Sequence, residues 1–117
     1  MKILPSERGR AGEAAACAFL RGKGYRIVER NWSCRFGELD IVARDGDVLA
    51  VVEVKLRRSD KYGGPEAAIS QQKRQRIAAA TRMYLAAFAC DLPVRFDVVT
   101  LCKGRIHLYR DAFPADR

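Results

Sequence analysis

The chain has 117 residues, 49% of them hydrophobic and 31% charged, which is typical of one soluble globular domain spanning residues 1–117. This composition excludes a disordered chain, a collagen-like chain and a small domain held together by disulfides. Lys and Arg number 22 and Asp and Glu 14, so the net charge is +8 and a polyanion is the first partner to test.

The predicted elements begin with a helix that runs from Ser6 to about Gly24. Ser6 is expected to cap this helix and Gly24 to end it. Its apolar stripe is predicted to consist of Ala14, Ala15, Ala18 and Phe19. An alternating segment then predicts a first strand at Tyr25–Arg30.

Two further strands are predicted at residues 37–44 and 48–56, and the Asp45-Gly46 pair between them is typical of a hairpin turn. If the loop consists of those two residues, Arg44 pairs with Asp47. That register decides which charged side chains share a face of the sheet.

A long helix is predicted to follow and to reach roughly Phe88. Its start is ambiguous, because Pro65 suits a first helical turn and Ser70 suits a cap. Apolar and small residues recur on one face at helical spacing, at Ile77, Ala80, Thr81, Tyr84, Leu85 and Phe88.

Two last strands are predicted at residues 94–101 and 105–109. Residues 48–52 are apolar on both faces, so their strand should be central and covered on both sides. The order α-β-β-β-α-β-β predicts an α/β domain with a mixed central sheet flanked by helices.

The cysteines and the apolar runs point to no special chemistry. No two cysteines lie within four residues of each other, so neither a zinc site nor a disulfide framework is expected. The longest apolar run, Met83–Cys90, is far too short to span a membrane, and the N-terminus has no signal-like apolar segment. We therefore expect a cytoplasmic protein with free thiols, no membrane partner and no small-molecule cofactor.

Charged residues interrupt the predicted hairpin at positions that share a face. Strand side chains alternate, so Glu38 groups with Asp40, and Glu53 groups with Lys55. The register above puts Glu38 opposite Glu53, and Asp40 diagonal to Glu53 at roughly 7–8 Å. An odd loop would place Asp40 and Glu53 on opposite faces.

Carboxylates that converge beside buried strands are costly unless a cation neutralises them. Such hard oxygen ligands suit Mg²⁺ or Mn²⁺. Lys55 would stand beside the ion, where it could orient or deprotonate a water or offset charge in a transition state. A structural ion pair between Lys55 and Glu53 or Glu38 explains the same spacing and stays open.

Asp40, a twelve-residue gap and then Glu53-Val54-Lys55 resemble the D-x(n)-E-x-K motif of the PD-(D/E)XK nuclease superfamily. Longer blocks resemble the YraN-like family of uncharacterised bacterial proteins, which is distantly similar to archaeal Holliday-junction resolvases. These blocks are Gly9-Arg10-Ala11-Gly12-Glu13, Arg35-Phe36-Gly37-Glu38-Leu39-Asp40-Ile41, Val52-Glu53-Val54-Lys55 and Arg95-Phe96-Asp97-Val98-Val99. The resemblance implies a restriction-endonuclease-like α-β-β-β-α-β core.

The resemblance also implies roles for single residues. Asp40 and Glu53 would bind the metal with the backbone carbonyl of Val54, Lys55 would be the catalytic lysine, and Glu13 would be an acidic residue near the metal. Glu38 has no place in the superfamily motif, so it is an auxiliary candidate only.

Most of the positive charge lies in one stretch. Residues 55–82 contain eight Lys or Arg and two Asp or Glu, which accounts for +6 of the +8. Free N–H groups and cations at a helix start bind phosphate, and a tyrosine can stack on an unpaired base. The predicted nucleic-acid contacts are Arg57, Arg58, Lys61, Tyr62, Lys73, Arg74 and Arg76.

These features lead us to expect a Mg²⁺- or Mn²⁺-dependent endonuclease acting on DNA, including branched DNA. A resolvase-like role would favour a homodimer. The alternative is a non-catalytic nucleic-acid-binding protein that retains the nuclease fold. A basic structural protein that binds RNA without regard to divalent metal is a weaker third reading.

Overall fold

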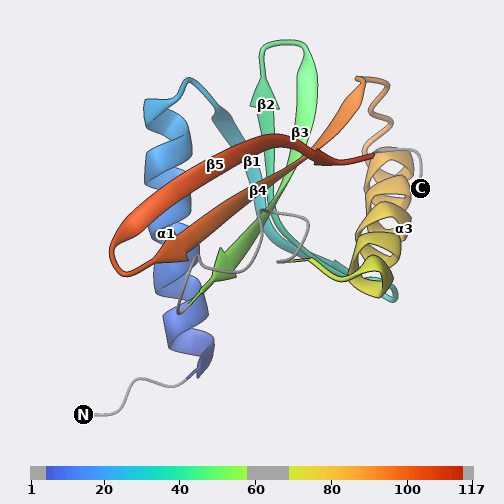
Figure 1. Ribbon diagram of the computed structural model, residues 1–117. Helices are drawn as coiled ribbons and strands as arrows, with labels where there is room; N and C mark the ends of the chain where they lie inside the picture. The colour runs from blue at the N-terminus through green and yellow to red at the C-terminus, as the bar shows by residue number, and fades with distance from the viewer. Residues whose placement is uncertain (1–4, 58–68, 115–117) are drawn as a thin grey trace.

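The computed structural model describes residues 5–57 and 69–114 (Figure 1). The elements follow the order helix α1, strands β1, β2 and β3, helix α3, and strands β4 and β5. Their bounds are α1 Pro5–Gly22, β1 Arg26–Cys34, β2 Gly37–Asp45, β3 Val48–Leu56, α3 Gln71–Ala87, β4 Val94–Cys102 and β5 Arg105–Phe113. The predicted α-β-β-β-α-β-β order is confirmed.

The strands form one mixed sheet in the order β1-β2-β3-β4-β5. β3 and β4 are parallel and are joined through α3, whereas the other neighbours are antiparallel. Helix α1 covers one face of the sheet and α3 covers the other (Figure 1). The predicted α/β class, with a mixed central sheet flanked by helices, is confirmed, and the element order matches the α-β-β-β-α-β core that the resemblance implies.

The central position predicted for residues 48–52 is also confirmed. Leu49 and Val51 pack toward α3, while Ala50 and Val52 pack toward α1, and all four side chains are buried. Because both faces are covered, this strand has no reason to alternate with polar residues.

The apolar stripe predicted for α1 is wrong. Ala14, Ala15 and Ala18 are exposed. The helix instead buries Ala16, Cys17 and Leu20 against the sheet. Alanines occupy both faces of this helix, so small apolar residues could not reveal its phase.

The ends of the helices follow the capping signals in part. Ser70, one of the two predicted starts, caps α3, and its hydroxyl accepts the backbone N–H of Lys73 at 3.1 Å. Gly24 has a φ of 94° and lies just after α1, as predicted. Ser6 lies within α1 rather than before its first residue, which is the position predicted for a cap.

All four cysteines are free thiols, two of them buried. Among the described residues, no helix combines the length and the apolarity needed to cross a membrane.

Candidate metal centre and phosphate-binding groups

The site lies where β2 and β3 separate. Their backbone ladder runs from Asp45↔Val48 to Ile41↔Val52. Beyond the end of this ladder, the backbone N–H of Val54 donates to the Asp40 carboxylate at 2.9 Å. The Asp40 side chain therefore accepts a hydrogen bond that the backbone of β2 would otherwise accept. The two strands separate at this carboxylate.

The predicted hairpin register is wrong by one residue on each strand. Asp45 pairs with Val48, so the loop consists of Gly46 and Asp47, and Gly46 has a φ of 62°. Glycine is favoured at this first loop position in a type II′ turn, whereas the prediction assumed a type I′ turn. The loop still has two residues, so Asp40 and Glu53 lie on the same face of the sheet, as predicted.

The shifted register changes the neighbours of both carboxylates on β2. Continuing it by one residue places Asp40 opposite Glu53, closer than the predicted diagonal. Glu38 pairs with Ser33 of β1, whose hydroxyl donates to its carboxylate at 3.3 Å. On the β3 side, the continued register places Glu38 opposite Lys55, so the predicted pairing of Glu38 with Glu53 is wrong.

Three carboxylates converge at this end of the sheet. Oxygens of Glu13 on α1 and of Glu38 and Asp40 on β2 all lie within 4.8 Å of one another. Burial raises the pKa of Asp40, and the nearby Glu38 raises it further. Burial also raises the pKa of Glu13, and Asp40 adds to that effect. Both carboxyls would gain from a cation placed among them.

Glu53 lies next to this group but is much more deeply buried, with 2% of its surface exposed. One carboxylate oxygen lies 3.5 Å from the Lys73 ammonium group, which reaches it from the first turn of α3. Burial, followed by repulsion from Asp40, raises the pKa of Glu53 to about 8. Lys73 opposes that shift because it favours the charged carboxylate.

Two carboxylate oxygens at this site have no hydrogen-bond partner among the described residues. They are Oε1 of Glu13 and Oε2 of Glu53, and both are buried. A buried acceptor without a partner is costly, so each is suited to accept a metal ion or a water.

The backbone of Val54 is oriented toward the same gap. The N–H and C=O of one strand residue point to the same side, and the Val54 N–H points to Asp40. Its carbonyl therefore faces the space that β2 leaves, near the position predicted for a metal ligand.

Cations line the two small cavities around Asp40. One cavity of about 290 Å³ is lined by Lys55 and Lys73 together with Glu13 and Asp40. The other, of about 200 Å³, is lined by Lys73 and Arg76 with Glu38 and Asp40. Among the predicted phosphate contacts, Lys73 and Arg76 thus lie beside the carboxylates.

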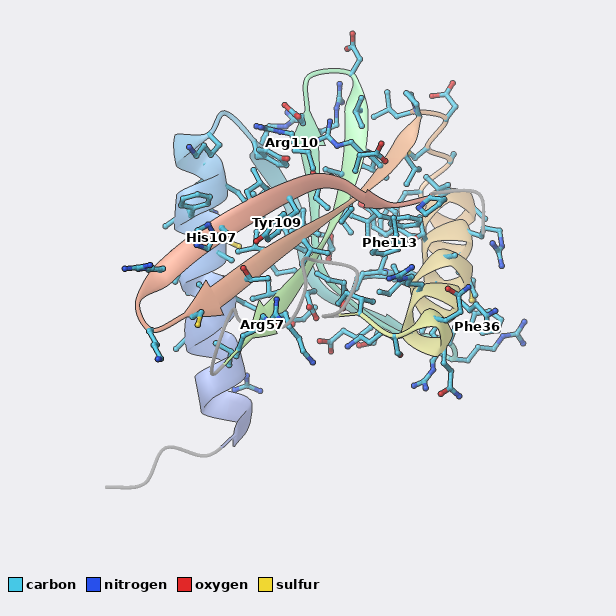
Figure 2. All side chains as sticks on the ribbon, viewed as in Figure 1. Phe36, Arg57, His107, Tyr109, Arg110 and Phe113 are labelled. Carbon is cyan, nitrogen blue, oxygen red and sulfur yellow. The ribbon has the colours of Figure 1, made fainter. Side chains whose placement is uncertain are left out.

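The other predicted contacts are dispersed. Arg74 donates to the carbonyl of Ile69, and its guanidinium lies 5.5 Å from the centre of the Phe113 ring, away from the carboxylates. Arg57 lies just beyond the end of β3 (Figure 2) and lines another cleft. Arg58, Lys61 and Tyr62 lie outside the described residues.

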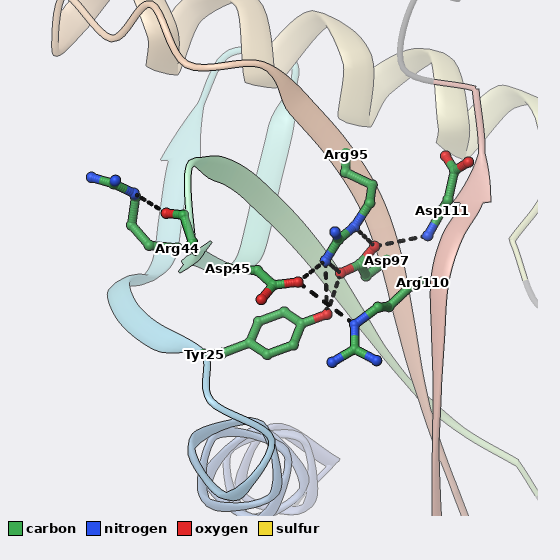
Figure 3. A network of polar contacts seen from close by, with 8 residues as sticks. Tyr25, Arg44, Asp45, Arg95, Asp97, Arg110 and Asp111 are labelled. Carbon is green, nitrogen blue, oxygen red and sulfur yellow. Dashed lines mark hydrogen bonds and ion pairs between the residues drawn. The ribbon is translucent and has the colours of Figure 1, made fainter.

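A polar network at the opposite end of the sheet was not predicted (Figure 3). Asp97, which is fully buried, accepts two hydrogen bonds from Arg95 at 2.8 and 2.9 Å and one from the Tyr25 hydroxyl at 2.7 Å. Arg95 also binds Asp45 at 2.8 Å. The sequence signal that could have indicated this network is Asp97, an acidic residue between the apolar residues Phe96 and Val98 of β4.

This network joins the end of α1 to the β2–β3 hairpin and to β4. Burial and the hydrogen bond to Asp97 raise the pKa of Tyr25 to about 12. The Tyr25 hydroxyl, Arg95 and Asp97 are all hydrogen-bonded to one another. We therefore assign the network a structural role in holding the sheet and α1 together.

The chain is similar to many bacterial proteins over most of its length. A protein of Syntrophus aciditrophicus is 50% identical over 110 residues, covering 90% of this chain and 87% of that protein. A protein of Xanthomonas euvesicatoria pv. vesicatoria is 45% identical over 121 residues, covering 99% and 98%. Both are named UPF0102 proteins.

One solved structure, described as "Crystal structure of SSO0001", superposes with a TM-score of 0.49 at 22% identity. The match covers 94% of this chain and 53% of that one. The model of "Uncharacterised protein family UPF0102" matches residues 12–101, a range that includes Glu13, Asp40, Glu53 and Lys55. The chain belongs to this family, the YraN-like family that its sequence motifs resemble.

Proposed function

We propose that this protein is a metal-dependent endonuclease that hydrolyses phosphodiester bonds in DNA, with branched or otherwise structured DNA among its substrates. The main support is the place of Asp40. Its carboxylate groups with those of Glu13 and Glu38, and it raises the pKa of the adjacent buried Glu53.

The donor set fits a hard divalent cation. The grouped side chains offer carboxylate oxygens, without a cysteine or histidine, and such donors suit Mg²⁺ or Mn²⁺ rather than zinc. Glu13 and Glu53 each hold a buried oxygen without a partner in the described part of the chain. Asp40 and Glu53 would hold the ion, with the Val54 carbonyl and Glu13 beside them.

A bound divalent ion would polarise the scissile phosphate and lower the pKa of a bound water. The chain's own cations would do the rest. Lys55 lines the cavity beside Asp40, where it can orient the attacking water or accept its proton. Lys73 and Arg76 can bind the non-bridging oxygens of the phosphate and offset the charge that develops there.

The test is cleavage of linear, single-stranded and four-way-junction DNA with Mg²⁺, with Mn²⁺ and with EDTA. Asp40→Asn and Glu53→Gln should each lower the cleavage rate by at least about two orders of magnitude, because they remove a metal ligand but keep its shape. Asp91→Asn, an exposed acidic residue outside the group, is the matched control and should cleave like the parent.

Cleavage that survives both substitutions, or that persists in EDTA, would refute the proposal. Tight DNA binding without cleavage under any metal would favour the second candidate, a nucleic-acid-binding protein without catalysis. The contact between Lys73 and Glu53 is the observation behind that candidate, because a lysine already partly neutralises this carboxylate.

A further inference from the structure

A second concave surface lies at the same end of the sheet, between α1 and the turn that joins β4 to β5. Its volume is about 530 Å³, and it is lined by Ala15, Leu56, Arg57, Leu101, Cys102, Lys103, Gly104, Arg105 and Ile106. We call it the β4–β5 cleft. Gly12 lets α1 approach its floor, since a Cβ at that position would lie 3.1 Å from a methyl carbon of Leu101.

The described lining of this cleft is basic. Among the residues that the structure describes, it includes Arg57, Lys103 and Arg105 but no Asp or Glu. Lys103 and Arg105 are exposed, and neither forms an ion pair with an acidic side chain of the described residues. Lys103 and Arg105 thus place two exposed cations beside this hollow, and such a basic surface attracts an anion with several negative charges.

The cleft adjoins the carboxylate site. Leu56 lines both the cleft and the cavity that contains Asp40 and Lys55, and 52% of its surface is exposed. The backbone N–H of Arg57 donates to the carbonyl of Leu101 at 2.8 Å, so β3 stays fixed to β4 up to this point. Lys55 and Arg57 are two residues apart, which is about 7 Å in an extended chain.

Turn geometry does not explain Lys103. Lys103 and Gly104 form the loop between β4 and β5, with φ values of 51° and 78°. Asparagine followed by glycine is the preferred pair in such a turn, and lysine is not favoured at φ above zero. The lysine therefore places a cation at the rim of the cleft at some cost in local conformation.

We propose that the β4–β5 cleft binds the phosphate backbone of the nucleic acid next to the phosphodiester held at the carboxylate site. This inference rests on the proposed function for its substrate class. Lys103 and Arg105 are its main contacts, and neither belongs to the sequence motifs or to the predicted binding residues. The recognised group is the phosphodiester, so the cleft contributes affinity without reading base sequence.

The test compares two double variants that each remove one Lys and one Arg charge. Lys103→Asn with Arg105→Gln neutralises the cleft, and the asparagine suits the turn. Lys23→Asn with Arg26→Gln removes equal charge near the other end of the sheet, where Arg26 pairs with Arg44. Binding to a DNA duplex, to single-stranded DNA and to the RNA of the same sequence is measured in EDTA at several salt concentrations, so that cleavage does not intervene.

We expect the cleft variant to bind DNA roughly tenfold more weakly than the control variant, because each exposed ion pair contributes a factor of about two to five. Its plot of log K against log salt for the duplex should be less steep by about 1.8, because each lost phosphate contact removes about 0.9. An unchanged unfolding midpoint excludes misfolding as the cause. Equal loss on RNA would mean that the cleft binds any phosphodiester backbone, and loss on DNA alone would restrict it to DNA.

Equal affinity and equal salt slope in the two variants would overturn the inference, as would a parent protein that binds no nucleic acid. These outcomes are separable from failure of the proposed function. Asp40→Asn should abolish cleavage and leave the difference between the two double variants intact, since the cleft does not contain that carboxylate.

Discussion

The buried carboxyl of Glu53 makes stability depend on pH in the absence of metal. Its pKa rises from the ordinary value of 4.5 to about 8 in the folded chain. Between these values the folded protein binds the proton more tightly than the unfolded chain does. The free energy of unfolding should therefore fall as pH rises from about 4.5 to about 8, by up to a few kcal/mol.

Glu53→Gln should remove most of that dependence. The variant is neutral at every pH, so in EDTA it should be more stable than the parent at pH 8.5 and differ little from it at pH 4.5. Urea unfolding at a series of pH values measures this. Lys73→Met is the complementary variant, because loss of the nearby ammonium should steepen the fall. A Glu53→Gln variant that is destabilised equally at both pH values would contradict the assignment.

The Asp97 network should be costly to break. Asp97 is fully buried and bound to Arg95, Tyr25 and the backbone N–H of Asp111. Asp97→Asn leaves the Arg95 charge with less compensation, so it should lower the free energy of unfolding by about 3 kcal/mol. Asp47→Asn removes a fully exposed carboxylate 3.9 Å from Arg44 and should have no measurable effect. Equal effects of the two changes in denaturant unfolding would show that the network adds nothing.

Among the elements, α3 links stability to the site through its first turn. Ser70 accepts the N–H of Lys73, and the Lys73 side chain reaches Glu53. Ser70→Ala should destabilise the protein by about 1 kcal/mol through the lost cap, and Ser70→Asp should restore most of it. Denaturant unfolding of the three proteins measures this. If Ser70→Ala matches the parent, the cap does not contribute to the stability of α3.

The order and type of the elements were predictable because they rest on local signals. The apolar run of residues 48–52, the Gly46 turn and the Ser70 cap each act within a few neighbours along the chain. The phase of α1 was not predictable, because alanines lie on all sides of the helix and only the sheet decides which face is buried. The register was missed because a single turn type moves every pair by one residue on each strand.

The residues of the candidate site could be predicted from the sequence, but their positions relative to one another could be predicted only in part. Asp40, Glu53 and Lys55 stand out as charges in apolar strands, and the structure brings Asp40 and Lys55 to one cavity. The grouping of Glu38 with Glu13 depends on how α1 lies on the sheet, which spacing along one strand cannot reveal. The β4–β5 cleft depends on segments about 45 residues apart, at Arg57 and Lys103, and no local pattern connects them.

At the scale of the whole molecule, the excess positive charge surrounds a small acidic centre. A chain of net charge +8 repels free cations at long range. The carboxylates of Glu13, Glu38 and Asp40, by contrast, form a local site that attracts a cation. A metal centre among these carboxylates would couple ion binding to folding, whereas a surface cluster would bind divalent ions weakly and without effect on folding.

Mn²⁺ should therefore stabilise the folded protein. An ion that binds only the folded state adds about 1.4 kcal/mol at ten times its dissociation constant, or roughly 5 °C in the melting temperature of a domain of this size. Glu38→Gln should reduce the shift, and Asp40→Asn should abolish it, because both remove oxygens from the group. Glu29→Gln, a carboxylate of β1 outside the group, should keep the full shift. Thermal melts of the four proteins across a Mn²⁺ titration measure this, and a shift of equal size in all four would mean that the ion binds elsewhere.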